Sequence, residues 1–553
     1  MNHLNTKTRF VVAPLHAVVV VGLVLLLAAT TQATTPGITA AAAPSGSTSA
    51  STFNLTAADG FITQPDGALI YSWGFGCAGT ATYAPAAFAS LGFCPTMQVP
   101  GPTLIVHEND TVTVTLTNNL PAGAGNTSIV FPGFQVIGNG TGSVAGLLAQ
   151  EAIPGGSVTY TFKATTPGTR AYYSGTQSDF QIEMGLYGAI VVLPNATPSG
   201  GTNCHDLNSD VAQTTVGTGN PGNDLRLAAS AYDHPETCYD REYLFQFMEL
   251  DSRIHRQAEE QVQAIANCTT ATNNGNPCPT SLSVKTEPYH PQYYLINGRA
   301  MPDDMDPDYA PNYPHQPYNG NPHMHPGDLV LVRTIGQGRW EHPFHEHGNH
   351  VRILARDGNL ILSQNDTAGY NGNTATPRLG GRMEFTTDTY PGQAYDGIFY
   401  WSGKGLGWDI YGHTPGNPGN PTCTPDVNGY DTSTPTASNY YEWCADHNHP
   451  LETNPVGQIA AGGPATQFDP LVATNGLWYN GTPYLGPDAV TRNRGNTPLP
   501  PAASTMNPLP ESGIAFMWHS HNEREITTND VFPGGMLMMM LVDPPVWYID
   551  ETL

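Results

Sequence analysis

The chain has few charged residues, and few of these are basic. Only 12% of its 553 residues are Asp, Glu, Lys or Arg, and 20 basic against 46 acidic residues leave a formal net charge of −26. Nucleic acids and anionic membranes attract basic surfaces, so this charge balance excludes both as ordinary partners. The sequence also has no Cys-x-x-Cys pair, which argues against a cysteine-based zinc or thiol redox motif.

Long apolar runs are missing except near the N-terminus. Lys7 and Arg9 precede an apolar run from Ala17 to Ala29, and small residues follow up to Ala33. This order predicts a signal peptide over residues 1–33, with a retained N-terminal anchor as the alternative. We expect an exported protein, periplasmic or extracellular, with no membrane contact after signal cleavage. Residues 34–52 are rich in Ala, Thr, Ser, Gly and Pro, a composition that predicts a flexible leader.

Turn-forming residues are abundant, and strand-like runs are short. The chain has 59 Gly and 49 Pro, which favour turns over long helices. Thr111–Thr117 alternates β-branched apolar and polar residues, and runs at 157–162, 189–193, 327–333 and 535–542 also indicate strands. The pattern predicts an all-β protein of sandwich domains.

The composition changes along the chain suggest two domains. We predict the first over residues 53–194, a polar linker over 195–240, and the second over 241–545, with a long insertion at about 405–511. Residues 252–266 have some helical character. The even count of 8 cysteines in an exported chain predicts disulfides, most simply between sequence neighbours, one of which would staple the insertion through Cys423 and Cys444.

Two short segments each contain His-x-His. They are His345-Glu-His347 and His519-Ser-His521. Because residues two apart on a β-strand face the same side, each pair can point in one direction. If the two strands are neighbours, four imidazoles converge into a site that suits copper, zinc, nickel or iron.

The same alternation places other residues behind this candidate site. His342 and Ser520 face the opposite side of their strands, and Met536 follows in the next strand. A thiolate at this position could complete a blue-copper site, but the hydroxyl of Ser520 is a poor ligand for a soft metal.

These segments resemble the signatures of the multicopper oxidase family. His342-Pro-Phe-His345-Glu-His347-Gly348 is similar to the family's His-Pro-x-His-Leu-His-Gly, and His519-Ser520-His521 is similar to its His-Cys-His. The resemblance implies two cupredoxin-like Greek-key β-sandwich domains and a copper cofactor. It implies that His345, His347, His519 and His521 serve the copper cluster, and that His342, Ser520 and Met536 are a remnant of the type 1 site.

The first domain resembles the family in its strand and turn segments but lacks the family's ligand histidines. Pro100–Val106 resembles an opening strand, and Gly185-Leu-Tyr-Gly188 fits the family's Gly-Leu-Tyr-Gly. Val130 and Pro132 stand where the family has His-x-His, and Gly175-Thr-Gln177 stands where it has His-Ser-His. The family's three-copper cluster uses eight histidines, and four of them remain in this sequence.

The residues and the resemblance together predict a secreted copper-binding protein. It would keep a four-histidine half-site and lack blue type 1 copper. Two alternatives stay open: a copper-dependent oxidoreductase acting on a small reductant or a metal ion, and a structural or assembly scaffold. A metal ion is the expected partner, and a homo-oligomer is a further alternative.

Overall fold

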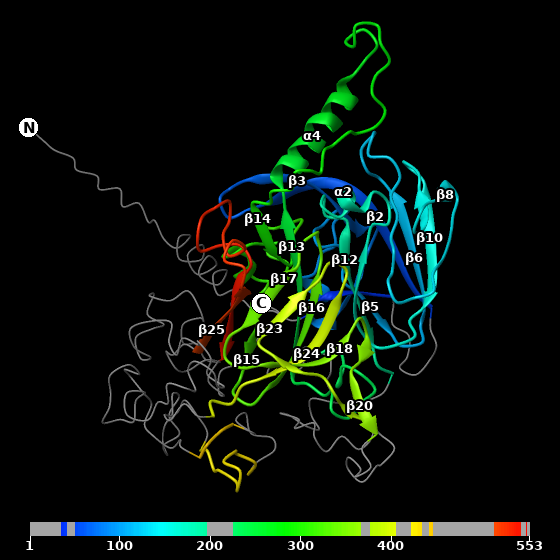
Figure 1. The fold of residues 1–553 in the computed structure, drawn as a ribbon. Helices are drawn as coiled ribbons and strands as arrows, with labels where there is room; N and C mark the ends of the chain where they lie inside the picture. The colour runs from blue at the N-terminus through cyan, green and yellow to red at the C-terminus, as the bar shows by residue number, and fades with distance from the viewer. Residues whose placement is uncertain are drawn as a thin grey trace, which may run out of the picture.

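The computed structural model describes residues 35–40, 50–195, 225–365, 377–404, 422–433, 442–445, 514–542 and 549. Over these residues the chain forms two β-sandwich domains side by side, with few helices (Figure 1). The prediction of an all-β protein with two cupredoxin-like sandwiches is confirmed. Among the described residues, none of the helices has the length and apolar character needed to span a membrane.

The first domain consists of two five-stranded sheets. One sheet has the order β11-β12-β5-β1-β4, built from Gly168–Tyr173, Tyr187–Leu193, Leu104–His107, Gly37–Thr39 and Thr82–Ala84. The other has the order β3-β2-β6-β10-β7, built from Leu69–Cys77, Ala50–Thr63, Thr111–Asn118, Ser157–Lys163 and Ile137–Asn139. Minor elements are β8 (Ser143–Ala145), β9 (Gln150–Ala152), η1 (Ala86–Ser90) and α2 (Ser178–Gln181).

The second domain repeats this two-sheet plan. The inner sheet has the order β14-β13-β16-β24-β18-β19, built from Tyr293–Ile296, Arg241–Leu250, Leu329–Gly336, Ala394–Tyr400, Val351–Arg356 and Asn359–Leu360, with β22 (Met383–Glu384) paired to β18. The outer sheet has the order β15-β26-β25-β17-β23, built from His323–Met324, Leu537–Val542, Ile514–Ser520, His342–Glu346 and Thr386–Thr389. Minor elements are β20 (Leu362–Asn365), β21 (Pro377–Leu379) and η2 (Asp303–Met305).

Strand pairing is the same in both domains. In the first, β2 runs parallel to β6, which pairs antiparallel with β10; in the second, β13, β16 and β24 pair in the same way. Likewise β5 lies parallel to β12, which is antiparallel to β11, and β15, β26 and β25 repeat that arrangement. The chain therefore crosses between sheets in the Greek-key manner in each domain. Because β11 of the first domain is equivalent to β25 of the second, the turn that follows β11 corresponds to the residues at the end of β25.

Alternating side chains explain why these segments are strands. In β6, Val112, Val114 and Leu116 are fully buried, and the threonines between them are exposed or half-buried. This is the pattern of a strand with one face on a core and one toward solvent. In the second domain, Phe344 of β17 and Trp518 of β25 are both 0% exposed and lie in one aromatic core between the sheets.

The inner sheet of the second domain faces the first domain. Thr169 of β11 donates a hydrogen bond from Oγ1 to Oδ1 of Asp396 in β24 at 2.6 Å, and it accepts one from Nη1 of Arg333 in β16 at 3.1 Å. The outer sheet, which contains β17 and β25, therefore lies on the side of its sandwich away from the first domain (Figure 1). The surface of the outer sheet that carries β17 and β25 therefore does not face the first domain.

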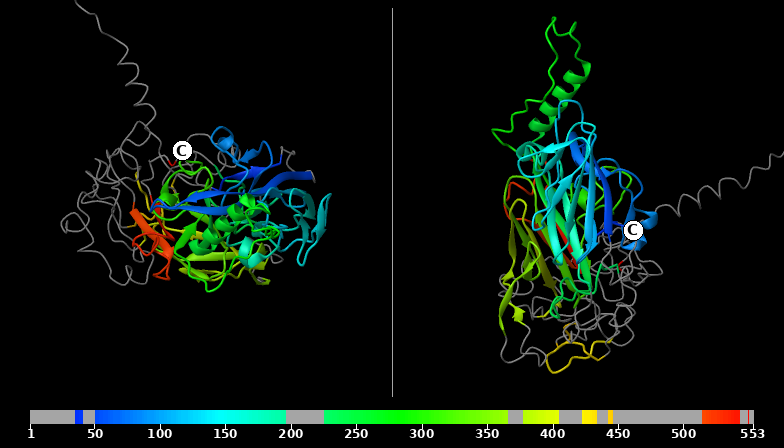
Figure 2. Two further views of the ribbon diagram at one scale, coloured as in Figure 1. Left: turned by 90° about the horizontal axis from the view of Figure 1, so that it is seen from above. Right: turned by 90° about the vertical axis from the view of Figure 1, so that its right-hand side faces the viewer.

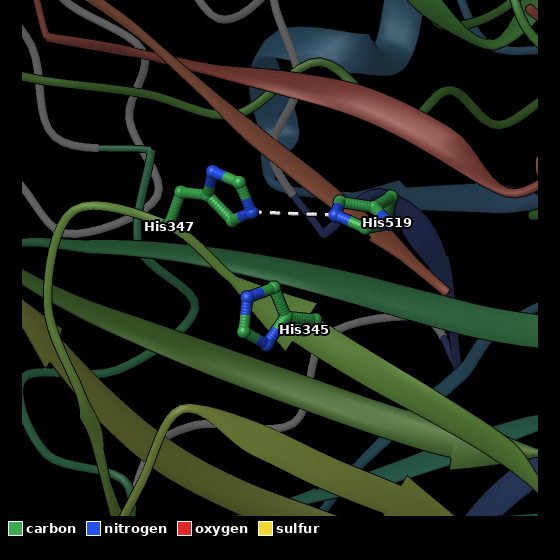
Figure 3. A group of neighbouring side chains, drawn as sticks. All are labelled: His345, His347 and His519. Carbon is green, nitrogen blue, oxygen red and sulfur yellow. Dashed lines mark hydrogen bonds between the residues drawn. The ribbon is translucent and has the colours of Figure 1, made fainter. Parts of the chain in front are cut away.

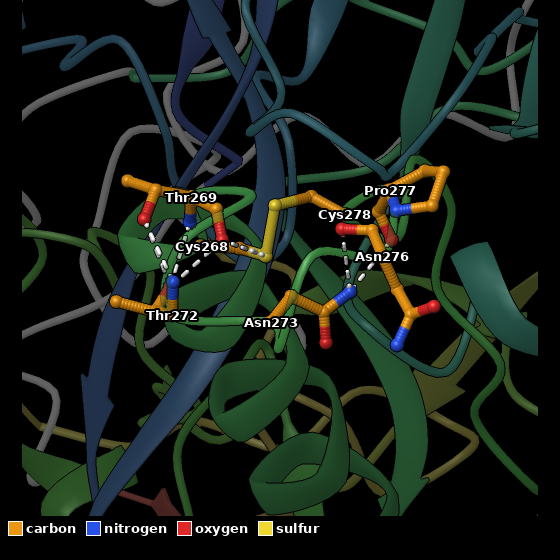
Figure 4. The surroundings of a disulfide bond; sticks show 7 residues. All are labelled: Cys268, Thr269, Thr272, Asn273, Asn276, Pro277 and Cys278. Carbon is orange, nitrogen blue, oxygen red and sulfur yellow. Dashed lines mark hydrogen bonds between the residues drawn. A yellow bond between two sulfur atoms is a disulfide. The ribbon is translucent and has the colours of Figure 1, made fainter.

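Helix α4 (Ser252–Asn267) is the one long helix among the described residues, and it confirms the expected helical segment. Ile254 and Ala258 are buried against the core of the first domain, whereas the far end of the helix projects from the body (Figure 2). A disulfide between Cys268 and Cys278 closes the loop beyond it, and Asn273 Nδ2 donates to the carbonyl of Pro277 at 2.7 Å (Figure 4).

The leader and linker predictions need correction. Residues 37–39 form β1 between β4 and β5, and β2 begins at Ala50, so parts of the expected flexible leader are strands of the first domain. Ile38 is 5% exposed, and its burial supplies the physical reason. The end of the expected linker also packs: Tyr232 is 2% exposed and its hydroxyl donates to Asp396.

Disulfides join neighbouring cysteines, as expected. The pairs are Cys77–Cys94, Cys268–Cys278 and Cys423–Cys444, the last within the predicted insertion. The predicted signal peptide, Cys204 and most of the insertion lie outside the described residues.

Candidate metal centre

Strands β17 and β25 are antiparallel neighbours, which the metal-site prediction required. In their register His345 lies opposite His519, and Phe344 lies opposite Ser520. Phe344 and Trp518 point into the core, so the alternation of side chains turns His345 and His519 to the outer face of the sheet. The aromatic residues of the two segments therefore anchor the strands, and the histidines between them are presented on one side.

Three imidazoles converge on that face. One ligand nitrogen from each of His345, His347 and His519 lies within 4.8 Å of the others, and all three residues are buried (Figure 3). Nε2 of His347 is 3.3 Å from Nε2 of His519. A metal ion about 2.0 Å from two imidazole nitrogens at a roughly tetrahedral angle separates those nitrogens by about 3.3 Å. The spacing of the apo side chains thus fits a single ion without rearrangement of this pair.

Neighbouring oxygens orient the rings of His519 and His345, and one of them selects a tautomer. Nδ1 of His519 is 2.6 Å from the carbonyl oxygen of Ser520, which can only accept, so Nδ1 carries the proton and Nε2 presents its lone pair. Nδ1 of His345 is 2.6 Å from Oγ1 of Thr386 in β23. Such partners fix the orientation of metal-binding imidazoles in known sites.

Burial and neighbouring imidazoles favour the neutral form of two of these histidines, His345 and His519. Burial lowers the pKa of the His345 imidazole, and the adjacent His347, His521 and His519 lower it further, to about 3. Burial also lowers the pKa of His519. A neutral imidazole is the form that binds a metal, so the apo site is prepared for an ion at neutral pH and below.

His521 lies at the edge of the cluster. Its ring centroid is 4.6 Å from that of His345, but its side chain is 51% exposed and Nδ1 is 3.4 Å from Oε1 of the exposed Glu523. Its nitrogens are not within the close group formed by the other three histidines. The fourth predicted ligand is therefore near the site and open to solvent, and it would need to rotate to complete a four-nitrogen set.

The residues predicted behind the site meet inside the sandwich, but with unexpected partners. His342 is 0% exposed; its Nε2 is 2.9 Å from Oε2 of Glu249 and its Nδ1 is 2.9 Å from Oε2 of Glu525. Ser520 donates its hydroxyl to the same oxygen of Glu525, and Met536 is buried and donates its backbone N–H to the carbonyl of Glu525. Glu249 was missed, because it lies in the ordinary-looking strand β13, 93 residues before His342.

This arrangement does not fit type 1 copper. Both ring nitrogens of His342 are committed to carboxylates, and Ser520 offers a hydroxyl in place of a thiolate and donates it to Glu525. Hard carboxylate and hydroxyl oxygens do not make the soft ligand set of a blue-copper site.

The two first-domain segments that contain the replaced histidine positions also come together, through hydroxyl groups of neighbouring residues. Ser128 and Thr176 share a hydrogen bond of 2.8 Å, and Thr127 donates to Gln181 at 2.9 Å. The outer sheet of the second domain lies on the far side from this network. The first domain of the same chain therefore neither contains the missing histidines nor faces the ones that remain.

A cavity of about 370 Å³ opens near the metal centre. Apolar residues line most of it, together with Asn349, His350 and Arg352, which follow His347 in the chain. The Phe385 ring lies between this cavity and the site, 4.9 Å from the His350 ring and 5.8 Å from the His345 ring.

Comparisons with known proteins agree on one family. A family model described as multicopper oxidase matches residues 94–197. Laccase abr2 of Aspergillus fumigatus is 38% identical over 98 residues, 18% of this chain and 16% of the relative. Copper resistance protein A of Pseudomonas syringae pv. tomato is 40% identical over 94 residues, 17% of this chain and 14% of the relative.

Similarity also extends to a third relative and to two solved structures. The copper-containing nitrite reductase of Pseudomonas chlororaphis is 35% identical over 98 residues, 17% of this chain and 25% of the relative. The matches thus span a quarter or less of these relatives' own length. A structure titled multicopper oxidase mgLAC and one of a blue copper oxidase from Nitrosomonas europaea each align at 15% identity with a TM-score of 0.41, over 90% and 89% of this chain and 86% of theirs.

The matched segment covers the later part of the first domain, from just before β5 to just beyond the end of β12. The histidine signatures that resemble the family lie outside this segment, on β17 and β25 of the second domain. The sequence match and the signature residues thus come from separate parts of one polypeptide, and residues 94–197 are similar to multicopper oxidases.

Proposed function

We propose that this protein is an exported copper-binding protein with one metal site on the outer sheet of its second domain. His345, His347 and His519 would be ligands, and His521 would join them by rotating its exposed ring inward. The observation that carries the proposal is the convergence of three buried imidazole nitrogens within 4.8 Å. Export to the periplasm or extracellular space is supported by the predicted signal peptide and by three disulfides among the described residues.

Copper is the metal that the site chemistry and the relatives favour together. Imidazole nitrogens bind copper more tightly than most divalent first-row metals. The names of the related proteins include two copper proteins and a laccase. We expect one ion and not a three-copper cluster, because the four first-domain positions hold Val130, Pro132, Gly175 and Gln177. We also expect no blue type 1 copper.

The test is the copper content of the purified mature protein after copper incubation and removal of loose metal. We expect about one copper per chain in the wild type and in His107→Ala, in which an exposed histidine outside the site is removed. The variant His345→Ala/His519→Ala should hold none. Three or four tightly held coppers per chain would contradict the proposal, because the described ligands cannot hold them.

A second candidate function is copper-dependent oxidoreduction of a small reductant or a metal ion. Two observations favour it: the solvent-open edge at His521 and the cavity beside His350 and Phe385. With no thiolate-ligated copper to relay electrons, a reductant would have to reach the site directly. Turnover that disappears in His519→Ala would support this function. Undiminished stability and assembly in a chain that holds no metal would favour the scaffold alternative.

A further inference from the structure

The position of type 1 copper in the family is filled here by a buried cluster of charged side chains. We infer that His342 is held as an imidazolium at neutral pH between Glu249 and Glu525, and that this built-in cation excludes copper from the position even when a thiolate is supplied. The inference concerns the interior of the sandwich and does not depend on the proposed site on the outer face.

Hydrogen-bond geometry carries the inference. A neutral imidazole has a single N–H, so it can donate to only one of two carboxylates. Both ring nitrogens of His342 lie 2.9 Å from carboxylate oxygens, and neither His342 nor either glutamate side chain is exposed. A lone pair facing a buried carboxylate at this distance would be strongly repelled, whereas two N–H donors satisfy both. Two opposed hydrogen bonds also leave the ring without a lone pair for a metal.

The surrounding groups donate hydrogen bonds that hold both glutamate carboxylates in place. Oε1 of Glu249 accepts the backbone N–H groups of Arg339 at 2.7 Å and Trp340 at 3.0 Å, and the Tyr289 hydroxyl lies 3.1 Å away. Oε1 of Glu525 accepts from Nδ2 of Asn522 at 2.9 Å. Donors to a carboxylate favour its charged form. The ionised carboxylates in turn raise the pKa of His342 against the opposing effect of burial.

The cluster joins three parts of the fold. Glu249 comes from β13 of the inner sheet, His342 from β17 of the outer sheet, and Glu525 from the loop after β25. Tyr289 continues it to the first domain, since its hydroxyl is 2.7 Å from Oε2 of the buried Glu183. A Cβ at Gly338 would lie 2.3 Å from Oε2 of Glu249, so the backbone closes tightly around the carboxylate. The position that type 1 copper would occupy is thus filled by the charged side chains of Glu249, His342 and Glu525.

The first experiment supplies the missing thiolate. We expect Ser520→Cys, loaded with copper, to bind no more copper than wild type and to show no blue thiolate-to-copper absorption; Ser520→Ala is the matched control. An extra copper with blue absorption in Ser520→Cys would overturn the inference. Loss of the outer-face copper would leave this comparison intact, because the blue absorption reports only the inner position.

The second experiment needs no substitution in the measured protein. In metal-free wild type carrying ¹⁵N-labelled histidine, NMR at about neutral pH should show two ring N–H protons on His342, with His342→Gln used only to assign the signals. The exposed neighbour variant Glu341→Gln should leave them unchanged. A neutral His342 with one N–H would overturn the inference.

Discussion

Alkaline pH should remove a stabilising contribution of His342. Burial acts to lower the pKa of this imidazole, but its hydrogen bonds to Glu249 and Glu525 outweigh burial and raise the pKa from 6.5 to about 9. Because the folded state binds the proton more tightly than the unfolded chain, the contribution is complete below about pH 6.5 and declines as pH rises through about 9. The difference of about 2.5 pKa units, at about 1.36 kcal/mol each, corresponds to about 3 kcal/mol.

Urea unfolding of the metal-free protein tests this value. The free energy of unfolding would be measured at about pH 6, 8 and 10 for wild type and for His342→Gln. The variant serves as the reference because both proteins contain Tyr294, which interacts with the two glutamates, and its partner Arg524. The stability difference should shrink by about 3 kcal/mol between about pH 6 and 10. The exposed Glu341→Gln should follow wild type. A difference that stays constant with pH would refute the protonated state of His342.

Three further predictions concern the outer face and the core beneath it. Copper binding should persist as pH falls below about 6.5, the ordinary pKa of histidine, because burial and the neighbouring histidines lower the pKa of His345 to about 3. Copper titrations at about pH 7 and 5 check this prediction, and complete loss of binding at about pH 5.5 would contradict it. Thr386→Val should weaken copper binding about 10- to 100-fold, because it removes the partner of His345 Nδ1. The control Thr389→Val removes a hydroxyl that donates to the His342 carbonyl and should leave copper binding unchanged. Equal copper affinities of the two variants by calorimetry would argue against the role of Thr386. Trp518→Ala should lower the free energy of unfolding by about 3–5 kcal/mol, because the 0% exposed indole packs on Phe399 and donates to the His347 carbonyl at 3.0 Å. A loss below about 1 kcal/mol in denaturant unfolding would exclude Trp518 as a core anchor.

Local pattern predicted most of the fold. The alternation in 111–117 became β6, and the turn-bounded runs at 157–162, 189–193 and 535–542 became β10, β12 and β26. The period of two also placed His345 and His519 on one face and His342 and Ser520 on the other. The prediction of a flexible leader, which rested on composition alone, was wrong in part. Gly37–Thr39 lies in a segment rich in small residues, yet it pairs with β4 and β5 because Ile38 reaches the core.

The sequence by itself determined that the chain is all-β, which residues could hold a metal, and that a thiolate and four histidines of the family's pattern are absent. These are properties of residue type and of strand periodicity, which need no knowledge of distant contacts. Only the tertiary structure decided what replaced them. Glu249 and His342 are 93 residues apart, and only the packing of the two sheets brings β13 and β17 together on opposite sides of one core. Burial there turns an ordinary strand glutamate into the partner of a charged imidazole, because an unpaired charge between the sheets would be too costly to keep.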